Sequence, residues 1–306
     1  MSDRLVVLCP GQGAQKVGMG KAWFDASPAS KAIFEEADAL LGDSLGLQLS
    51  EICFQDPNGE INQTNISQPA IYTCSVASWH GLREQGLEGD LIATAGLSLG
   101  EYTALHLAGV FSFTEGLRLV ARRGQLMQAA AEAKESTMVA VIGDDEVALT
   151  LCEEAKEGDE ILVPANFNAP GQIVLSGSVA ACHRVATLAS ERGVRATPLS
   201  VAGAFHSPFM STAAKGMRDA FSEATIQTPK IDVWSNVTAA VHEPETIADC
   251  LVEQITGSVR WAQSCSSMAK EYDGCQWHEL APSSVLRGLM RRVNRDVKVQ
   301  SHDEPK

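Results

Sequence analysis

The chain lacks several features that mark common protein classes. No apolar run in its 306 residues approaches the length of a membrane span, and its start lacks the charged-then-apolar order of a signal peptide. Its eight cysteines include no C-x-x-C pair, which indicates buried thiols in a reducing cytoplasm, not a zinc or disulfide framework. Its net charge is −14, which argues against nucleic acid as the main partner.

What the chain does carry is a serine between two glycines at a strand-to-helix junction. Leu91–Ala95 is a short apolar run that predicts a buried strand, and Gly100–Ala108 consists of good helix formers. The five residues between these runs, GLSLG at 96–100, fit the nucleophile elbow G-x-S-x-G. In that turn the hydroxyl of Ser98 stands above the sheet edge, and the amide of Leu99 points at an oxyanion formed there. The pattern predicts acyl transfer through a seryl ester.

A second segment, GDSLG at 42–46, matches the same pattern and resembles the motif of a family of lipolytic enzymes. The residues before it, Ala32–Leu41, have apolar side chains at helical spacing, so Ser44 follows a helix and not a strand. The elbow requires a strand, a turn and a helix in that order. We therefore favour Ser98 over Ser44 as the nucleophile.

The rest of the chain alternates between strand and helix patterns, which predicts an α/β fold with a parallel sheet. An N-terminal strand is expected at Arg4–Cys9 and a helix at Pro69–Gln85, and a charged tail at 303–306 is expected to be disordered. From Thr137 to Val201 the order becomes βαββαβ, the ferredoxin-like unit. We expect residues 134–201 to form this unit as an insertion into a core made of residues 1–133 and 202–306.

A serine nucleophile needs a base, and one of the seven histidines has a suitable setting. His106 lies eight residues beyond Ser98, roughly 12 Å along the same helix, so it cannot reach the hydroxyl. His206 follows a predicted strand in a loop with apolar neighbours and a proline stop. Loops at strand ends are where a scaffold presents catalytic groups, which makes His206 the candidate base.

These motifs together resemble one family, the malonyl-CoA:acyl-carrier-protein transacylases and the related acyltransferase domains of polyketide synthases. The resemblance extends nearly from end to end. It rests on segments in the family's order: PGQGAQ at 10–15, the elbow, RRG at 122–124, NFNAPGQ at 166–172, AFHS at 204–207, and Gln254 ahead of VRW at 259–261. The family fold is an α/β-hydrolase-like core with a ferredoxin-like insertion.

The resemblance implies a role for each site residue. Ser98 and His206 form the catalytic dyad, and the backbone amides of Gln12 and Leu99 bind the oxyanion. Arg123 pairs with the free malonyl carboxylate, and a backbone carbonyl at Gln254 orients the histidine. The implied reaction moves malonyl from malonyl-CoA to acyl carrier protein through a malonyl-serine, without a metal or bound cofactor. We expect a cytoplasmic monomer that binds neither nucleic acid nor a membrane.

The sequence departs from the family pattern at two places. Leu97 replaces the histidine that usually precedes the nucleophile, which removes a polar neighbour of the serine. Ala281–Ser284 replaces a Gly-Pro-Gly-Lys-type turn near the substrate mouth, so contacts with CoA or the carrier can differ. The pair Ala204-Phe205 ahead of the histidine is, in related domains, associated with malonyl rather than methylmalonyl.

An acidic enzyme needs a local basic surface to bind a carrier protein that is itself acidic. The candidate is the predicted helix Val285–Arg295, with Arg287, Arg291, Arg292 and Arg295 as the carrier-protein patch; a solvated amphipathic face is the alternative. For the whole chain, the alternatives are a trans-acting polyketide acyltransferase, a thioester hydrolase with the same dyad, and an inactive carrier-binding module. The substrates of a simple thioester hydrolase have no free carboxylate to bind, so the presence of Arg123 argues against that alternative.

Overall fold

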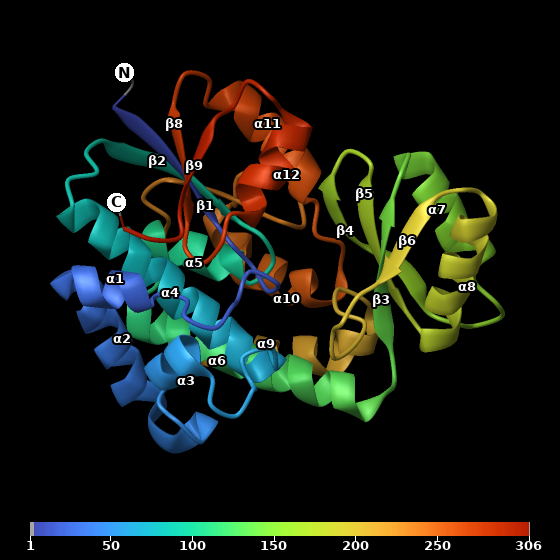
Figure 1. Cartoon of the computed structure of the whole chain (residues 1–306), viewed down its shortest axis with the longest axis horizontal. Helices are drawn as coiled ribbons and strands as arrows, with labels where there is room; N and C mark the ends of the chain where they lie inside the picture. Colours follow the sequence, from blue (N-terminus) through green and yellow to red (C-terminus); the bar gives the residue numbers. More distant parts are fainter. Residues whose placement is uncertain (1–2, 306) are drawn as a thin grey trace.

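The computed structural model describes residues 3–305 and contains two sheets, each with its own helices (Figure 1). The larger sheet has five parallel strands in the order β7-β2-β1-β8-β9. These strands are β1 (Arg4–Cys9), β2 (Asp90–Gly96), β7 (Asp232–Trp234), β8 (Gln276–Leu280) and β9 (Val299–His302). Because the strands are parallel, the loops after β1 and β2 meet at one edge of the sheet.

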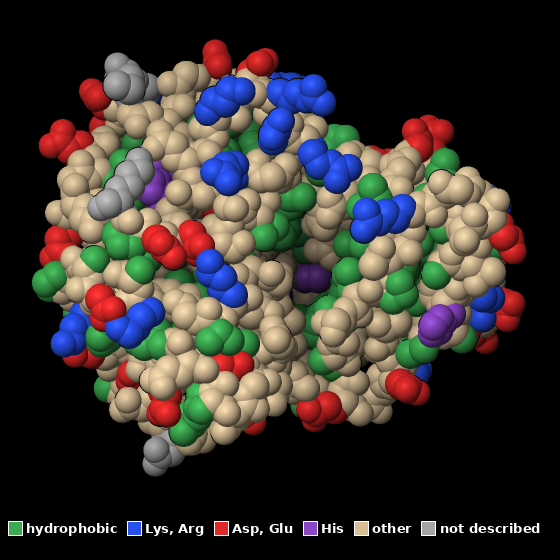
Figure 2. Space-filling model, viewed as in Figure 1, with side chains coloured by type: hydrophobic (Ala, Val, Ile, Leu, Met, Phe, Trp, Pro, Cys, Tyr) green, Lys and Arg blue, Asp and Glu red, His purple; other side chains and the backbone are tan. Residues whose placement is uncertain are grey.

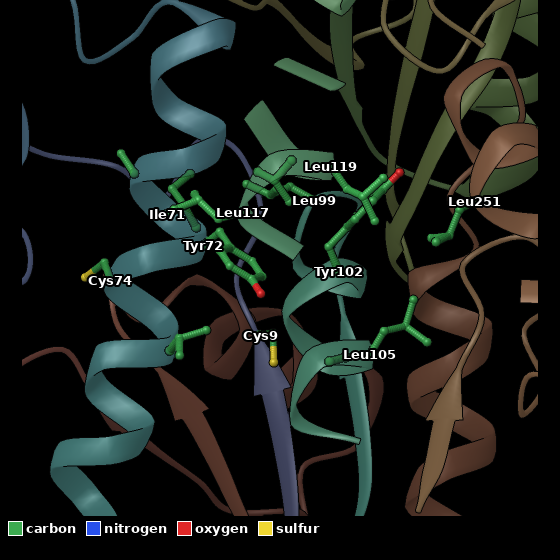
Figure 3. Close-up of a cluster of buried hydrophobic side chains, with 14 of the residues drawn as sticks. Cys9, Ile71, Tyr72, Cys74, Leu99, Tyr102, Leu105, Leu117, Leu119 and Leu251 are labelled. Atoms are coloured by element: carbon green, nitrogen blue, oxygen red, sulfur yellow. The ribbon is translucent and has the colours of Figure 1, made fainter. Parts of the chain in front are cut away.

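Helices cover both faces of this sheet. They are α1 (Lys21–Ala26), α2 (Pro28–Leu41), α3 (Leu49–Gln55), α4 (Thr64–Glu84), α5 (Gly100–Leu107), α6 (Phe113–Ala133), α9 (Ser211–Glu223), α10 (Ile247–Thr256), α11 (Trp261–Glu271) and α12 (Val285–Val293). Alternate residues of β1 enter two different cores: Val7 and Cys9 pack with α4 and α5, whereas Val6 and Leu8 pack with α11 and α12. Figure 3 shows Cys9 between Tyr72 of α4 and Leu105 of α5, all in one buried cluster.

The smaller sheet is antiparallel, in the order β4-β5-β3-β6. Its elements are β3 (Thr137–Ile142), α7 (Asp145–Glu154), β4 (Leu162–Ala169), β5 (Gln172–Gly177), α8 (Val179–Glu191) and β6 (Arg195–Pro198). This is the βαββαβ order of the ferredoxin-like unit, so the predicted fold class is confirmed. We propose 134–201 as the limits of the insertion and 1–133 with 202–306 as the core, because all six elements fall inside the former range.

Several helices begin where the sequence supplies an N-cap. The side chains of Ser27, Ser112, Asp144 and Ser178 each accept a backbone N–H from the first turn of α2, α6, α7 and α8. Local side-chain chemistry therefore sets these four boundaries. Within residues 3–305, no helix is both long and apolar enough to cross a bilayer.

Two expectations were wrong. The helix predicted from Pro69 begins at Thr64, and Pro69 lies inside α4. The helical turn before Pro69 is buried, and Thr64 and Gln68 are completely inaccessible to solvent. Tertiary packing of this turn therefore outweighs the local preference of proline for the start of a helix. The expected disordered tail is held at its first residue: Asp303, directly after β9, accepts hydrogen bonds from the Lys16 side chain and the Ser283 N–H. Lys306 lies outside the described residues.

Candidate active site

Ser98 occupies a sharp turn between β2 and α5. Its backbone φ is 52°, in the left-handed region that non-glycine residues rarely adopt. A Cβ atom on Gly96 would lie 1.8 Å from the carbonyl carbon of Gly100, and one on Gly100 would lie 2.1 Å from the carbonyl oxygen of Cys9. Both glycines are therefore sterically required. Together they let the turn present Ser98 at the carboxyl edge of the parallel sheet.

Ser44, in the second G-x-S-x-G match, has a different environment. It lies in a short 3-10 helix, Gly42–Leu45, that follows α2, and it is exposed. No strand precedes it, so the hydroxyl is not aimed across a sheet edge.

His206 lies directly against the serine. Its Nε2 atom is 2.8 Å from the Oγ of Ser98, and its Nδ1 is 2.7 Å from the backbone oxygen of Gln254. The carbonyl can only accept a hydrogen bond, so Nδ1 carries the proton and Nε2 is the basic nitrogen. Burial, and secondarily the charge of Arg123, lower the pKa of His206 to about 4 although the Gln254 carbonyl raises it. The imidazole is therefore neutral at physiological pH and able to accept the serine proton.

The other histidines have different partners. His106 contacts the carbonyl oxygen of Phe111 at 3.0 Å, and His183 is exposed on α8. His242, which precedes Glu243 and Pro244, is buried and lies 2.6 Å from Glu101. His278 and His302 lie side by side on β8 and β9. His206 alone among the seven contacts the Ser98 hydroxyl in residues 3–305.

Arg123 reaches the same hydroxyl from α6. Its side chain is 1% exposed, and one terminal nitrogen lies 3.0 Å from Ser98 Oγ and 2.9 Å from the side-chain oxygen of Gln254. The other terminal nitrogen donates to Gln68 at 2.6 Å. Within residues 3–305, its guanidinium forms no ion pair with a carboxylate, and its Nε has no hydrogen-bond acceptor. The site thus holds a buried cation whose partners are neutral.

Gln254 connects the other groups. Besides the carbonyl that binds His206 and the side-chain oxygen that binds Arg123, its side-chain nitrogen donates to the Ser98 carbonyl at 3.0 Å. The resemblance implied the first of these contacts. The two contacts through the side chain were not predicted.

Sequence reasoning also missed Asn236, which follows β7. Its side-chain oxygen accepts the Ser98 N–H at 2.6 Å, and its side-chain nitrogen donates to the Gly96 carbonyl at 2.8 Å. Asn236 is thereby bound to both sides of the elbow. An asparagine after a short strand carries no recognisable signal in a single sequence; only the parallel pairing of β7 with β2 places it here.

Two backbone amides beside Ser98 are available as donors. Within residues 3–305, neither the Gln12 N–H nor the Leu99 N–H donates a hydrogen bond. Gln12 lies in the loop after β1, and its side chain is held by the Thr64 hydroxyl at 3.2 Å. Free amides at the edge of a parallel sheet are suited to stabilising negative charge on an oxygen.

These groups open into a cavity of about 330 Å³ between the two subdomains. Figure 2 shows the hollow, with a histidine side chain visible at its floor. The core contributes Gln12, Leu97, Ser98, Arg123 and His206; the insertion contributes Asn166, Asn168 and Val174. A smaller adjoining cavity shares Gln12 and Leu97 and extends to Val285 and Leu289 of α12. Leu97, where the family has histidine, therefore forms an apolar wall common to both.

The turn that departs from the family pattern lies outside these cavity walls among the described residues. Ser75 of α4 donates to the Ala281 carbonyl at 2.6 Å, and the Ser283 N–H binds Asp303. The turn is thus tied to α4 and to the C-terminal segment. The helix that follows the turn, α12, does line the smaller cavity, through Val285 and Leu289.

The four arginines of the predicted carrier-protein patch are exposed on α12 and just beyond it. Lys and Arg side chains gather beside the hollow in the region of α11 and α12 (Figure 2). Arg292 differs from the other three, because it donates to the Pro170 and Gly171 carbonyls and to Gln172 in the turn between β4 and β5. Arg287, Arg291 and Arg295 form no ion pair within residues 3–305. Three of the four arginines are free to bind a partner, and Arg292 joins the subdomains.

The chain is similar throughout to acyltransferases. A family model described as the acyl transferase domain matches residues 6–301. A malonyl CoA-acyl carrier protein transacylase from Bacillus subtilis is 37% identical over 306 residues, covering 99% of this chain and 94% of that protein.

Solved structures agree with the sequence comparison. The crystal structure of malonyl-CoA:acyl carrier protein transacylase from Xanthomonas oryzae is 38% identical with a TM-score of 0.92, covering 100% of this chain and 96% of that one. A second solved structure is a type II polyketide synthase acyl-carrier protein in complex with its malonyl-transacylase. The matching chain of this complex is 34% identical with a TM-score of 0.91, and the match covers 99% of this chain and 96% of that one.

Proposed function

This chain belongs to the acyl transferase domain family, and on that premise we propose that it transfers the malonyl group from malonyl-CoA to the phosphopantetheine thiol of an acyl carrier protein. The observation that carries the choice of substrate is the buried, unpaired guanidinium of Arg123 at 3.0 Å from the Ser98 hydroxyl. A buried charge without a counter-ion is costly. A malonyl thioester supplies the missing carboxylate, whereas an acetyl thioester does not.

In the first half-reaction, Ser98 Oγ attacks the thioester carbonyl carbon while its proton moves to Nε2 of His206. The 2.8 Å contact between these atoms is within the range for direct proton transfer, and the neutral imidazole is the form required. The carbon–sulfur bond of the tetrahedral intermediate then breaks. His206 returns the proton to the departing CoA thiolate, and a malonyl-serine ester remains.

The amides of Gln12 and Leu99 hold the oxyanion of the tetrahedral intermediate. Their role is supported by the absence of any other acceptor for them in the described part of the chain, residues 3–305, and by the position of Gln12 in the cavity wall beside Ser98. Preorganised amides act mainly on the transition state, because the charge on this oxygen develops there and not in the substrate.

The second half-reaction reverses these steps with a different thiol. His206 Nε2 takes the proton of the carrier's phosphopantetheine thiol, and the thiolate attacks the malonyl-serine carbonyl. Collapse of the intermediate breaks the ester bond, and His206 protonates Ser98 Oγ. One histidine serves as base and acid in each direction, so no further acid–base residue and no metal or bound cofactor is required.

The carrier protein docks on the basic face of α12, through Arg287, Arg291 and Arg295, beside the mouth of the cavity. These arginines lack ion-pair partners within residues 3–305, and they provide local positive charge on a chain of net charge −14. The smaller cavity, lined by Val285 and Leu289 of α12, adjoins the Ser98 cavity and offers an apolar path from this face to the serine.

The remaining properties follow from the same groups. Ser98, His206 and Arg123 reach one another within a single subunit without a second copy, which supports a monomer as the active unit. All eight cysteines are free thiols, which supports a reducing compartment, the cytoplasm. A role in a polyketide pathway is the second candidate, favoured by the likeness to a malonyl-transacylase in complex with a polyketide synthase carrier.

The two half-reactions can be tested separately. Mixing the protein with malonyl-CoA alone should give a covalent malonyl adduct by intact-mass spectrometry, and adding holo acyl carrier protein should discharge it onto the carrier thiol. Loss of the adduct to water at the same rate with and without carrier protein would identify a hydrolase instead. Carriers from fatty acid and polyketide systems, compared by kcat/KM, distinguish the two pathways.

A further inference from the structure

A buried carboxylate lies behind the nucleophile and takes no part in the two half-reactions. Glu101 stands in the first turn of α5, three residues beyond Ser98, and is completely buried. Burying a charged carboxylate is expensive unless it is paired and fully hydrogen-bonded. Its contacts therefore indicate what it is retained for.

The counter-ion of Glu101 is His242. The Nε2 atom of His242 lies 2.6 Å from one carboxylate oxygen of Glu101, and both side chains are at most 1% exposed. Burial alone would lower the pKa of His242, but the neighbouring side chains of Cys250 and Glu101 raise it to about 9. His242 is thus an imidazolium at neutral pH, and the pair is neutral overall.

The remaining hydrogen bonds of Glu101 lead to both halves of the catalytic machinery. Its second carboxylate oxygen accepts the side-chain N–H of Gln254 at 2.6 Å, and Gln254 is the residue whose carbonyl orients His206. The backbone N–H of Asn236 lies 3.3 Å from each carboxylate oxygen, and the Asn236 side chain binds the elbow on both sides of Ser98. One carboxylate therefore connects the supports of the nucleophile and of the base.

We propose that Glu101 and His242 act as a positioning pair, which holds Asn236 and Gln254 so that Ser98 Oγ and His206 Nε2 keep the alignment needed for proton transfer. This inference rests on the proposed function, because it concerns the same dyad. The dyad needs such support because Ser98 and His206 both have left-handed backbones, at φ values of 52° and 57°, which neighbouring contacts must hold in place. A carboxylate normally contacts the histidine of a serine triad directly; here it acts one residue away, through Gln254.

The pair also explains how a carboxylate can lie near the site without changing its protonation. An uncompensated anion there would favour the charged form of His206 and neutralise part of the Arg123 charge. The protonated His242 cancels that effect. The pair therefore holds Asn236 and Gln254 in place without adding net charge beside the site, and Arg123 stays available to an anionic substrate.

Two isosteric substitutions test the pair, Glu101→Gln and His242→Gln, with the double variant. In Glu101→Gln the new amide NH₂ faces either the Gln254 amide, which is a donor, or His242 Nε2, which can accept it only as a neutral imidazole, so the charged pair is lost. We expect the rate of malonyl-serine formation at saturating malonyl-CoA to fall by about 10- to 100-fold, since small misplacements of reacting groups have effects of this size. KM for malonyl-CoA should stay within about threefold, because neither residue lines the cavity among the described residues.

The double variant should be no less active than the single variant with the lower activity, as expected for residues that act as one unit. Matched controls are Glu146→Gln, an exposed first-turn glutamate of α7, and His183→Gln, an exposed histidine of α8; both should retain the wild-type rate. If circular dichroism shows that Glu101→Gln is not folded, the acylation rate of His242→Gln alone tests the pairing proposal.

Folded variants that acylate within about twofold of wild type would overturn the pairing proposal, as would a loss confined to KM. Failure of the wild-type chain itself to form a malonyl adduct would instead overturn the proposed function. The two failures are therefore distinguishable in one set of measurements.

Discussion

The Nδ1 atom of His206 lies 2.7 Å from the main-chain oxygen of Gln254, so a peptide carbonyl orients the proposed base. In a serine protease triad a carboxylate takes this position and stabilises the imidazolium as it forms. A neutral carbonyl gives less stabilisation, and the pKa of His206 stays near 4 because burial and the Arg123 charge oppose protonation. A base with so low a pKa is weak, but its protonated form is a strong acid and readily returns the proton to the departing thiolate.

Ser98→Ala should abolish the malonyl adduct and leave the fold intact, because the variant removes only the hydroxyl from the elbow. Ser44→Ala is the matched control in the second G-x-S-x-G segment and should form the adduct normally. Intact-mass spectrometry after mixing with malonyl-CoA measures both. An adduct that persists in Ser98→Ala but disappears in Ser44→Ala would reverse the assignment.

Arg123→Ala should lose malonyl transfer and gain in relative preference for acetyl-CoA. Losing a buried, charge-assisted pair with the malonyl carboxylate costs about 2–4 kcal/mol, or roughly 30- to 1000-fold in kcat/KM for malonyl-CoA. Its exposed neighbour on α6 gives the control, Arg122→Ala, which should behave as wild type. An unchanged acetyl-to-malonyl ratio in Arg123→Ala would mean that this residue does not select the substrate.

The acylation rate should be independent of pH from about pH 5 to 8. The folded pKa of His206 is lowered to about 4 from an ordinary value of 6.5, so the imidazole is neutral and competent throughout this range. Below about pH 4 the rate should fall tenfold per pH unit as the base becomes protonated. Rapid-quench measurement of malonyl-serine formation checks this, and a half-maximal rate near pH 6.5 would contradict it.

Stability should fall as the pH rises above neutrality, through the buried pair of Glu101 and His242. The folded pKa of His242 is raised to about 9, so its stabilising effect is complete below 6.5 and is lost as the pH rises through 9. From pH 7 to 8.5 the free energy of unfolding should fall by about 1.2 kcal/mol per pH unit. Urea unfolding at several pH values tests this. His242→Gln should remove the slope; a slope that persists would show that another group causes it.

Reversing the charges of Arg287 and Arg291 to Glu should raise KM for the carrier protein and leave malonyl-serine formation from malonyl-CoA nearly unchanged. The effect should be larger at low salt, because screening weakens attraction between exposed charges. A variant with Arg118→Glu and Lys215→Glu changes the net charge equally at exposed positions on α6 and α9 and should keep the wild-type KM. Equal loss of both half-reactions would point to a damaged fold or a shared CoA contact.

The sequence predicted those parts of the structure that depend on local patterns. The βαββαβ insertion was recognisable because its apolar residues repeat with helix or strand spacing over six successive elements. The elbow was recognisable because two glycines are sterically required around Ser98. By contrast, β9 has only four residues, VQSH, with a single aliphatic side chain, so no periodicity revealed it. The helices α1 and α3 were missed because six and seven residues are too few to show a helical repeat.

Contacts between distant segments could not be predicted. His242 and Glu101 are 141 positions apart, and their 2.6 Å contact depends on the order of β7 and β2 in the sheet. A histidine beside Glu243 and Pro244 has the composition of a surface turn, so its burial could not be predicted from the local sequence. The side-chain contacts of Gln254 were likewise invisible, since nothing local to α10 indicates that it faces the elbow.

The left-handed backbones at Ser98 and His206 reduce the stability of the fold, although the side chains at these positions are required for activity. A side chain in this conformation costs about 1 kcal/mol relative to glycine, so glycine at either position would relieve strain in the native state. Glycine there would also remove the nucleophile or the base. At Ser98, where glycine removes only a hydroxymethyl group, selection for stability and selection for turnover therefore oppose each other. At His206 the buried imidazole and its bond to the Gln254 carbonyl offset the strain, so the catalytic side chain also supports the fold.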